Sequence, residues 1–229
     1  MVIGNGMIAK EFDGYRNNDE FIIFASGVSD STHAPAAAFE REAQMLKDAI
    51  SNSHGKRLVY FSTCSIFDHS MAGSPYVQHK KRMESLIVAG QNNYTIFRLT
   101  NPVGKTNNSN TVVNFFITHI HNKQPFTVWK NASRNIIDID DMYLICNDIL
   151  SSGSFLNEIV TIANPHNYPV PFVVETIEKH FHTKGIYTLV DKGDGPLIDI
   201  SKVEKLFRKF NINFDEDYLP RLLQKYFPA

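Results

Sequence analysis

Three short apolar runs, separated by stretches of helical periodicity, constrain the fold of this 229-residue chain more than any other feature. The runs cover residues 21–25, 58–61 and 94–98, and the first is continuously apolar, as in a strand that is buried on both faces. Apolar residues recur at helical spacing over residues 35–53, and a second helix is predicted over residues 74–89. The order strand, helix, strand, helix, strand predicts parallel pairing with right-handed crossovers, and therefore an α/β fold.

The pattern changes after Pro102, where a polar loop rich in asparagine precedes shorter elements. The expected helices cover residues 112–122, 141–151, 172–182, 201–210 and 217–227, and the expected strands cover residues 125–129, 134–141, 159–163 and 186–190. We therefore expect an abbreviated Rossmann-like, doubly wound parallel sheet in residues 1–105. A small α+β substrate lobe is expected in residues 106–229, with residues 136–165 returning to the first sheet.

The composition excludes several classes of protein. Hydrophobic residues make up 43% of the chain, and the net charge of −1 gives no basic excess to attract nucleic acid or a membrane surface. The two cysteines, Cys64 and Cys146, are not spaced as a disulfide framework or a zinc site. No apolar stretch reaches the ~18 residues of a membrane span. We expect a cytoplasmic protein without a nucleic-acid partner, a membrane partner or a metal site.

Gly4, Gly6 and Ala9 form a GxGxxA pattern directly after a very short predicted strand at residues 1–3. In a dinucleotide fold the first glycine permits a tight turn and the second lets the backbone approach a pyrophosphate. The small third residue allows close packing of a helix. An ordinary glycine turn is the alternative.

Tyr76 and Lys80 lie four residues apart in the helix predicted over residues 74–89, and therefore share one helix face. Ser74 and Pro75 provide an N-cap and a first-turn proline, which place Tyr76 in the first turn. An ammonium group held beside a phenol favours the phenolate, which makes the phenol a usable acid or base near neutral pH. A surface tyrosine over a solvated lysine is the alternative.

Polar residues also follow two predicted strands at their carboxyl ends, where open parallel sheets build ligand crevices. Thr63 and Ser65 carry hydroxyls that can hydrogen-bond a substrate alcohol or carbonyl, and turn capping is the alternative. Asn101 precedes a proline that ends its strand abruptly. Arg134 can form a forked contact with a phosphate, or an ion pair with one of the aspartates that follow it, Asp138 or Asp140.

Taken in order, these motifs resemble those of the extended short-chain dehydrogenase/reductase family, in particular its NAD-dependent epimerase/dehydratase group, which acts on nucleotide sugars. The resemblance runs from residue 2 to about residue 150. The matching motifs are the glycine turn at residues 4–9, Phe-Ala-Ser-Gly at 24–27, Phe-Ser-Thr at 61–63, Tyr76 with Lys80, residues 98–104, and Arg134 with Asp138 and Asp141.

The resemblance implies a role for each matching residue. Tyr76 is expected to exchange a proton with a sugar hydroxyl, Lys80 to bind the nicotinamide ribose, and Thr63 to orient the reacting oxygen. The residues expected to contact NAD or NADP are Gly4, Asn5, Gly6, Met7, Ile8, Ala25, Ser26, Gly27, Lys80, Asn101 and Val103. The residues expected to bind the nucleotide-sugar substrate are Ser65, Asn101 and Arg134.

Two departures from the family pattern stand out. Only about a dozen residues separate Ala9 from the strand at residues 21–25, where the family has two strands, two helices and an acidic residue that binds the adenosine ribose. Asp19 or Glu20 lies nearer to the glycines than that residue does, just before the strand, and the resemblance does not carry the role over to either. The gap between Thr63 and Tyr76 is also shorter than the family's substrate loop.

The resemblance therefore implies an NAD(P)-dependent oxidoreductase or epimerase of a nucleotide-activated sugar, serving polysaccharide biosynthesis. A homodimer through helices 35–53 and 74–89 is compatible with the resemblance. The alternative is a non-catalytic or regulatory binding module on the same fold, with an impaired cofactor site. The missing adenosine segment motivates that alternative, whereas the intact set of Tyr76, Lys80 and Thr63 argues against it.

Overall fold

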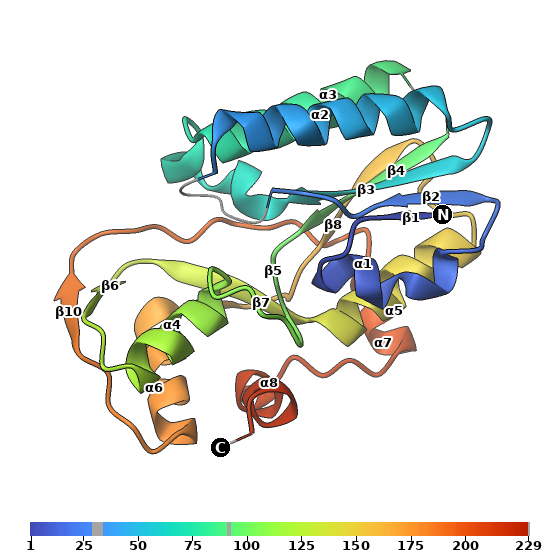
Figure 1. Ribbon diagram of the computed structural model, residues 1–229. Coiled ribbons are helices and arrows are strands. Elements are labelled where there is room, and N and C mark those ends of the chain that lie inside the picture. The colour runs from blue at the N-terminus through green and yellow to red at the C-terminus, as the bar shows by residue number, and fades with distance from the viewer. Residues whose placement is uncertain (29–33, 91–92, 229) are drawn as a thin grey trace.

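The computed structural model describes residues 1–28, 34–90 and 93–228. Among these residues, the largest sheet has five parallel strands in the order β1-β2-β3-β4-β8 (Figure 1). They are β1 (Val2–Ile3), β2 (Phe21–Phe24), β3 (Arg57–Thr63), β4 (Tyr94–Leu99) and β8 (Glu158–Ile162). The predicted α/β fold with a Rossmann-like parallel sheet is confirmed.

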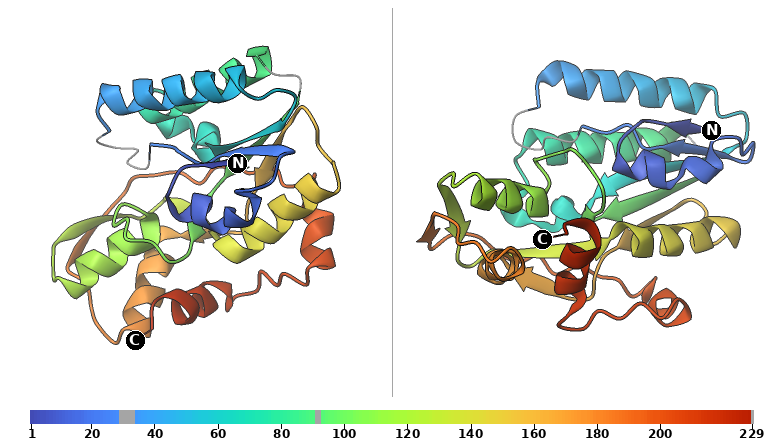
Figure 2. Two further views of the ribbon diagram at one scale, coloured as in Figure 1. Left: turned by 45° about the vertical axis from the view of Figure 1, so that its right-hand side comes forward. Right: turned by 60° about the horizontal axis from the view of Figure 1, so that its bottom comes forward.

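Helices cover both faces of this sheet (Figures 1 and 2). The helices α2 (Ala36–Ser51) and α3 (Pro75–Gly90) lie on one face, and α1 (Met7–Glu11) and α5 (Ile139–Ser151) lie on the other. Alternate residues of each strand point to opposite faces. Ile22 therefore packs with the helices α2 and α3, while its neighbour Ile23 packs with α5.

β1 lies at the edge of the sheet and pairs only with β2, with Val2 opposite Ile23. Between β1 and β2 the chain forms only the five-residue α1 and one turn of 3-10 helix, η1 (Asp13–Tyr15). No strand of the described residues lies beyond β1. The strand order therefore does not reverse at β1.

The later residues build a second, smaller group of elements below the sheet (Figure 1). Its strands are β5 (Asn101–Val103), β6 (Phe126–Trp129), β7 (Ser133–Asp138), β9 (Asn167–Pro169) and β10 (Tyr187–Val190). Its helices are α4 (Val112–His121), α6 (Val170–His180) and α8 (Tyr218–Tyr226), which share a second core. The remaining helix, α7 (Glu204–Lys209), places Phe207 in the first core.

Two predicted boundaries were wrong. The strand expected over residues 134–141 ends at Asp138, because the Asp138 carboxylate accepts a hydrogen bond from the Asp140 amide, at 3.0 Å, and caps α5. The helix expected over residues 201–210 is shorter, because the Asp199 carboxylate accepts a hydrogen bond from the Ser201 amide and the chain forms a turn there before α7 begins. Within the described part of the chain, no helix combines the length and apolar character needed to cross a bilayer.

Candidate active site

The carboxyl end of β3 supplies the first predicted site residues. Thr63 is buried, and its hydroxyl accepts a hydrogen bond from the Ser65 amide at 3.1 Å and donates one to the Ser65 hydroxyl at 3.0 Å. This pattern caps the 3-10 helix η2 (Cys64–Phe67), so the capping alternative describes both residues. A second 3-10 turn, η3 (His69–Met71), completes the short connection to α3.

α3 begins as the sequence indicates, because the Ser74 hydroxyl accepts a hydrogen bond from the Val77 amide at 3.2 Å. Tyr76 is half-buried in the first turn, and its hydroxyl has no hydrogen-bond partner among the described residues. The Lys80 ammonium lies 6.0 Å from the centre of the Tyr76 ring. The structure thus brings the phenol and the amine together on one face of α3.

The Lys80 ammonium is buried, and three oxygen atoms surround it. It donates to the Tyr60 hydroxyl at 2.9 Å, to Glu42 Oε1 at 3.1 Å and to the Phe61 carbonyl at 3.4 Å. All three ammonium protons are therefore engaged within the protein. The carbonyl contact is the longest of the three, and is the one most readily exchanged for another oxygen.

Glu42 is the buried carboxylate at the centre of this group. It accepts hydrogen bonds from the Tyr60 hydroxyl at 2.8 Å and from the Val28 amide at 2.9 Å. His79 Nε2 lies 3.1 Å from Glu42 Oε2, at ion-pair distance but misaligned for a hydrogen bond. Burial alone would raise the pKa of Glu42, but His79, Lys80 and these donors lower it to about 2. Glu42 is thus an ionised group that holds Lys80 in place.

A second buried carboxylate, Glu84, lies one turn beyond Lys80 on α3. It receives two hydrogen bonds from Arg98, at 2.9 and 2.6 Å, and one from the Ser62 hydroxyl at 2.6 Å. These bonds tie α3 to the ends of β3 and β4, and they raise the pKa of Arg98 above its ordinary value. Burial raises the pKa of the neighbouring Cys64 thiol to about 12, so this thiol is not a nucleophile at neutral pH.

The residues after β4 lie at the same rim of the sheet. The Asn101 side chain donates to the Asn135 carbonyl at 2.7 Å. Val103, the last residue of β5, is buried and pairs with Asp138 of β7. The hydroxyl oxygen of Thr100 is buried and has no hydrogen-bond partner among the described residues. An unpartnered polar atom of this kind is unusual in a folded protein.

Arg134 makes no ion pair with any carboxylate of the described residues, and the predicted alternative of a bond to Asp138 or Asp140 is wrong. Both aspartates instead contact Lys225, each at 2.7 Å. The Arg134 guanidinium donates to the Ser133 carbonyl at 2.8 Å, and burial lowers its pKa while Asp68 opposes that shift. Most of its donors therefore remain open to a ligand.

The glycine turn after β1 approaches β2 closely. Gly4 has φ +127°, and a Cβ placed there would lie 2.5 Å from the Ala25 carbonyl oxygen, so only glycine fits. A Cβ on Gly6 would meet nothing within 4 Å, which leaves the open space that a nearby ligand needs. A Cβ on Gly27 would lie 3.1 Å from Lys80 Nζ. The backbone of Gly27 thus borders the Lys80 ammonium at this rim.

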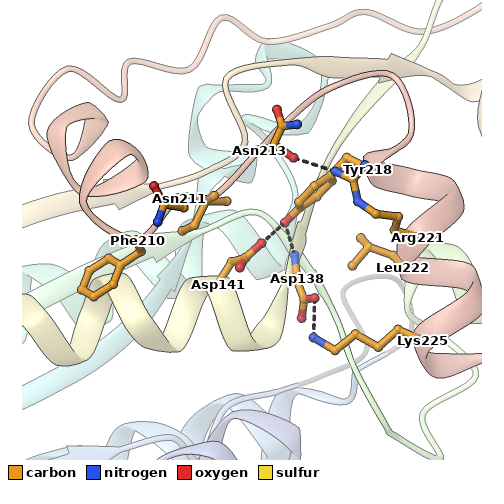
Figure 3. A pocket seen from close by; sticks show the side chains of 10 residues that line it. Asp138, Asp141, Phe210, Asn211, Asn213, Tyr218, Arg221, Leu222 and Lys225 are labelled. Atoms are coloured by element: carbon orange, nitrogen blue, oxygen red, sulfur yellow. Dashed lines mark hydrogen bonds and ion pairs between the residues drawn. The ribbon is translucent and has the colours of Figure 1, made fainter.

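A cavity of about 330 Å³ lies between α5 and the C-terminal segment, away from Tyr76, Lys80 and Thr63 (Figure 3). Its charged side chains are already paired, since Tyr218 donates to Asp141 and Lys225 contacts Asp138.

Tyr60, Glu42, Glu84 and Thr100 escaped prediction from the sequence. Glu42 left one detectable signal, because it occupies a position of α2 that lies three residues after Phe39 and four before Leu46, on the apolar face. A charged residue on that face is rarely buried without a partner. Tyr60 gave no signal, since a tyrosine in an apolar strand indicates only packing.

A family model described as "NAD dependent epimerase/dehydratase family" matches residues 8–162. The match covers more than half of the chain, and the predicted motifs lie within it or directly before it. The chain belongs to this family. No curated protein sequence matches the chain.

Several solved structures share the fold. A UDP-N-acetylglucosamine 4-epimerase from Methanobrevibacter ruminantium M1, in complex with UDP-N-acetylmuramic acid, has a TM-score of 0.66 and 18% identity over 89% of this chain and 74% of its own. A dTDP-glucose 4,6-dehydratase from Bacillus anthracis, in complex with NAD, has a TM-score of 0.69 and 14% identity over 95% and 76%. RMD from Pseudomonas aeruginosa, complexed with NADPH, has a TM-score of 0.66 and 14% identity over 90% of both chains.

The residues present fit one half of a nicotinamide dinucleotide. The open space at Gly6, the bare backbone of Gly27 beside Lys80 and the unpartnered Thr100 hydroxyl suit a ligand at the rim above β2, β3 and β4. On the other side of β1, where the adenosine half lies in a dinucleotide fold, the described residues provide no strand. The described residues therefore suit the nicotinamide half of the cofactor and do not suit its adenosine half.

Proposed function

We propose that the chain is an enzyme that acts on a nucleotide-activated sugar, with Tyr76 as its acid/base. The observation that carries this proposal is the half-buried phenol of Tyr76, whose hydroxyl has no partner among the described residues and whose ring lies 6.0 Å from the Lys80 ammonium. Membership of the epimerase/dehydratase family supports the same activity. The fold-related structures with UDP-sugars, NAD and NADPH support the substrate and cofactor classes.

In this proposal Tyr76 removes a proton from a sugar hydroxyl, or returns one to a sugar carbonyl oxygen. A nicotinamide bound at this rim would supply the hydride chemistry at the sugar carbon that carries this oxygen. Thr63 orients the reacting oxygen, after its hydroxyl turns from Ser65 toward the sugar. Lys80 binds the nicotinamide ribose by exchanging its long bond to the Phe61 carbonyl for a ribose hydroxyl.

Arg134 is proposed to bind the phosphates of the nucleotide sugar. The absence of an ion pair with a described carboxylate leaves its forked donors for two phosphate oxygens. Ser65 is proposed to contact the sugar. Asn101, Val103 and the segment from Ala25 to Gly27 are proposed to flank the cofactor. The proposed contacts to the phosphates of the cofactor remain Gly4, Asn5, Gly6, Met7 and Ile8.

The test compares the wild-type chain with Tyr76→Phe on a panel of UDP- and dTDP-sugars with NAD and NADP, following both product formation and nicotinamide absorbance. The phenylalanine variant is expected to lose about 10²- to 10⁴-fold in turnover, because general acid–base catalysis contributes that much. Tyr187→Phe, which removes a hydroxyl without a described partner, is the matched control and should retain full activity. Equal turnover in Tyr76→Phe and the wild type would refute the assignment.

A binding or regulatory module is the second candidate function. Two observations favour it: protein oxygens saturate the Lys80 ammonium, and the described residues place no strand beyond β1. Calorimetry at millimolar concentrations of oxidised and reduced NAD and NADP distinguishes the two functions. Binding of either cofactor favours the enzyme, whereas no binding favours the module.

A further inference from the structure

The strand order of the main sheet limits which part of a dinucleotide it can recognise. A dinucleotide-binding fold consists of two mononucleotide-binding halves, and the ligand lies across the crevice where the strand order reverses. Here the order β1-β2-β3-β4-β8 runs in one direction, and β1 is the edge. The described sheet therefore builds one mononucleotide-binding half and no reversal point.

The residues between β1 and β2 do not replace the missing half. Phe12 and Tyr15 are buried in the first core, and the Tyr15 hydroxyl donates to Asn147 of α5 at 2.7 Å. The helix α1 has five residues, which is less than two turns. This segment covers the underside of the sheet and forms no wall beside β1.

The two acidic residues that directly precede β2 lie at the wrong end of the sheet for binding an adenosine ribose. Asp19 and Glu20 directly precede β2, at its amino end, whereas ligands of open parallel sheets bind at the carboxyl ends of the strands. The Asp19 side chain is 98% exposed and contacts Lys56 at 3.1 Å. Neither carboxylate faces the rim that holds Tyr76 and Lys80.

On the opposite side of the glycine turn lie the groups that suit a nicotinamide nucleotide. Gly27 borders the Lys80 ammonium, Tyr76 lies one turn before Lys80, and the buried Thr100 hydroxyl at the end of β4 has no partner among the described residues. We infer, resting on the proposed function, that the site recognises the nicotinamide mononucleotide half of its cofactor and makes no specific contact with the adenosine half. Reduced nicotinamide mononucleotide is then a sufficient ligand.

The experiment is isothermal titration calorimetry of the wild-type chain with four probes: NADH, NADPH, reduced nicotinamide mononucleotide and ADP-ribose. The three nicotinamide compounds are expected to have dissociation constants within about threefold of one another, because the groups that bind them are the same. ADP-ribose is expected neither to bind in that range nor to displace reduced nicotinamide mononucleotide.

A matched pair of glycine variants shows whether the three compounds share one site. Gly27→Ala places a Cβ 3.1 Å from Lys80 Nζ, and the flexible lysine can shift without unfolding the chain. The variant should raise the dissociation constants of all three nicotinamide compounds by the same factor. Gly14→Ala is the control, because a Cβ on Gly14, in η1, meets nothing within 4 Å. This variant should leave all three dissociation constants unchanged.

The possible outcomes separate this inference from the proposed function. NADH binding about tenfold or more tightly than reduced nicotinamide mononucleotide would overturn the inference alone, as would displacement of the mononucleotide by ADP-ribose. A tenfold preference between NADH and NADPH would overturn it too, since these compounds differ only in the adenosine half. Failure of all three nicotinamide compounds to bind would overturn the proposed function and the inference together.

Discussion

Three oxygen atoms surround the ammonium group of Lys80, and one of them belongs to a buried carboxylate. Glu42 and Tyr60 fix the ammonium between α2, β3 and α3, next to the ring of Tyr76. A buried charge without a partner is costly, so the Lys80 ammonium and the Glu42 carboxylate each need the other in order to stay buried. The geometry of the proposed acid/base therefore depends on a glutamate that does not itself reach the rim.

The Glu42 carboxylate should make a measurable contribution to stability above acid pH. Its pKa falls from 4.5 to about 2 in the folded chain. A depressed pKa adds stability that is complete above the ordinary pKa and is lost as the pH falls from 4.5 toward 2. The size of that contribution is about 3 kcal/mol. Glu42→Gln should therefore be less stable than the wild type at neutral pH, with a flatter pH dependence in this window.

Urea unfolding at several pH values measures this difference. Glu40→Gln is the matched control, because Glu40 lies on the exposed side of α2 and contacts Arg82 in solvent at 2.7 Å. The control should follow the wild-type curve. If Glu42→Gln lost stability on acidification as steeply as the wild type does, the buried carboxylate would not be the group that titrates.

The sequence was sufficient to place Tyr76 and Lys80 on one face, because i and i+4 positions of a helix are always adjacent. It was not sufficient to find the partners of Lys80. Glu42 and Tyr60 come from other elements, and their approach depends on how α2 and α3 pack across β3. Contacts that cross elements require the fold before they can be predicted.

At the scale of elements, α8 is tied to the start of α5 by two tyrosines and a lysine, since Tyr226 and Lys225 both contact the Asp138 carboxylate and Tyr218 contacts its amide. The Tyr218 hydroxyl accepts a hydrogen bond from the Asp138 amide at 2.8 Å and donates one to Asp141 at 2.7 Å (Figure 3). Burial raises the pKa of Asp141, and the bond from Tyr218 opposes that shift. One hydroxyl thus satisfies two polar groups where the C-terminal helix meets the sheet.

Tyr218→Phe should lower the free energy of unfolding by about 1–3 kcal/mol, because it leaves a buried amide and a half-buried carboxylate without their partner. Tyr187→Phe should change it by less than about 0.5 kcal/mol, since that hydroxyl has no described partner. Chemical denaturation of both variants gives the comparison. Equal stability of the two variants would show that the hydroxyl of Tyr218 does not anchor α8.

Long periodic elements were predictable from the sequence, and two of the short strands were not. The strands β2, β3 and β4 and the helices α2 and α3 follow the predicted ranges closely, because each has many residues that agree with one pattern. β5 and β9 have three residues each and escaped prediction. Their conformation depends on pairing with β7, which lies far away in the sequence.

At the scale of the whole molecule, the chain keeps the carboxyl rim of a Rossmann-like sheet and lacks the half beyond β1. The short interval between Ala9 and β2 predicted this loss, and the edge position of β1 agrees with it. How the remaining segment folds was not predictable, because the packing of Phe12 and Tyr15 against α5 joins residues that are distant in the sequence. The division into a sheet domain and a substrate lobe remains a proposal.

A crystal structure of the chain with NADH tests most directly whether Tyr76 and Lys80 form a cofactor rim. The nicotinamide ring is expected beside Tyr76, with the ribose hydroxyls on Lys80 in place of the Phe61 carbonyl and at hydrogen-bond distances of about 3 Å. The adenosine is expected to make no contact with the residues around β1. A nicotinamide bound away from Tyr76, or an adenosine held firmly against the edge of β1, would contradict this arrangement.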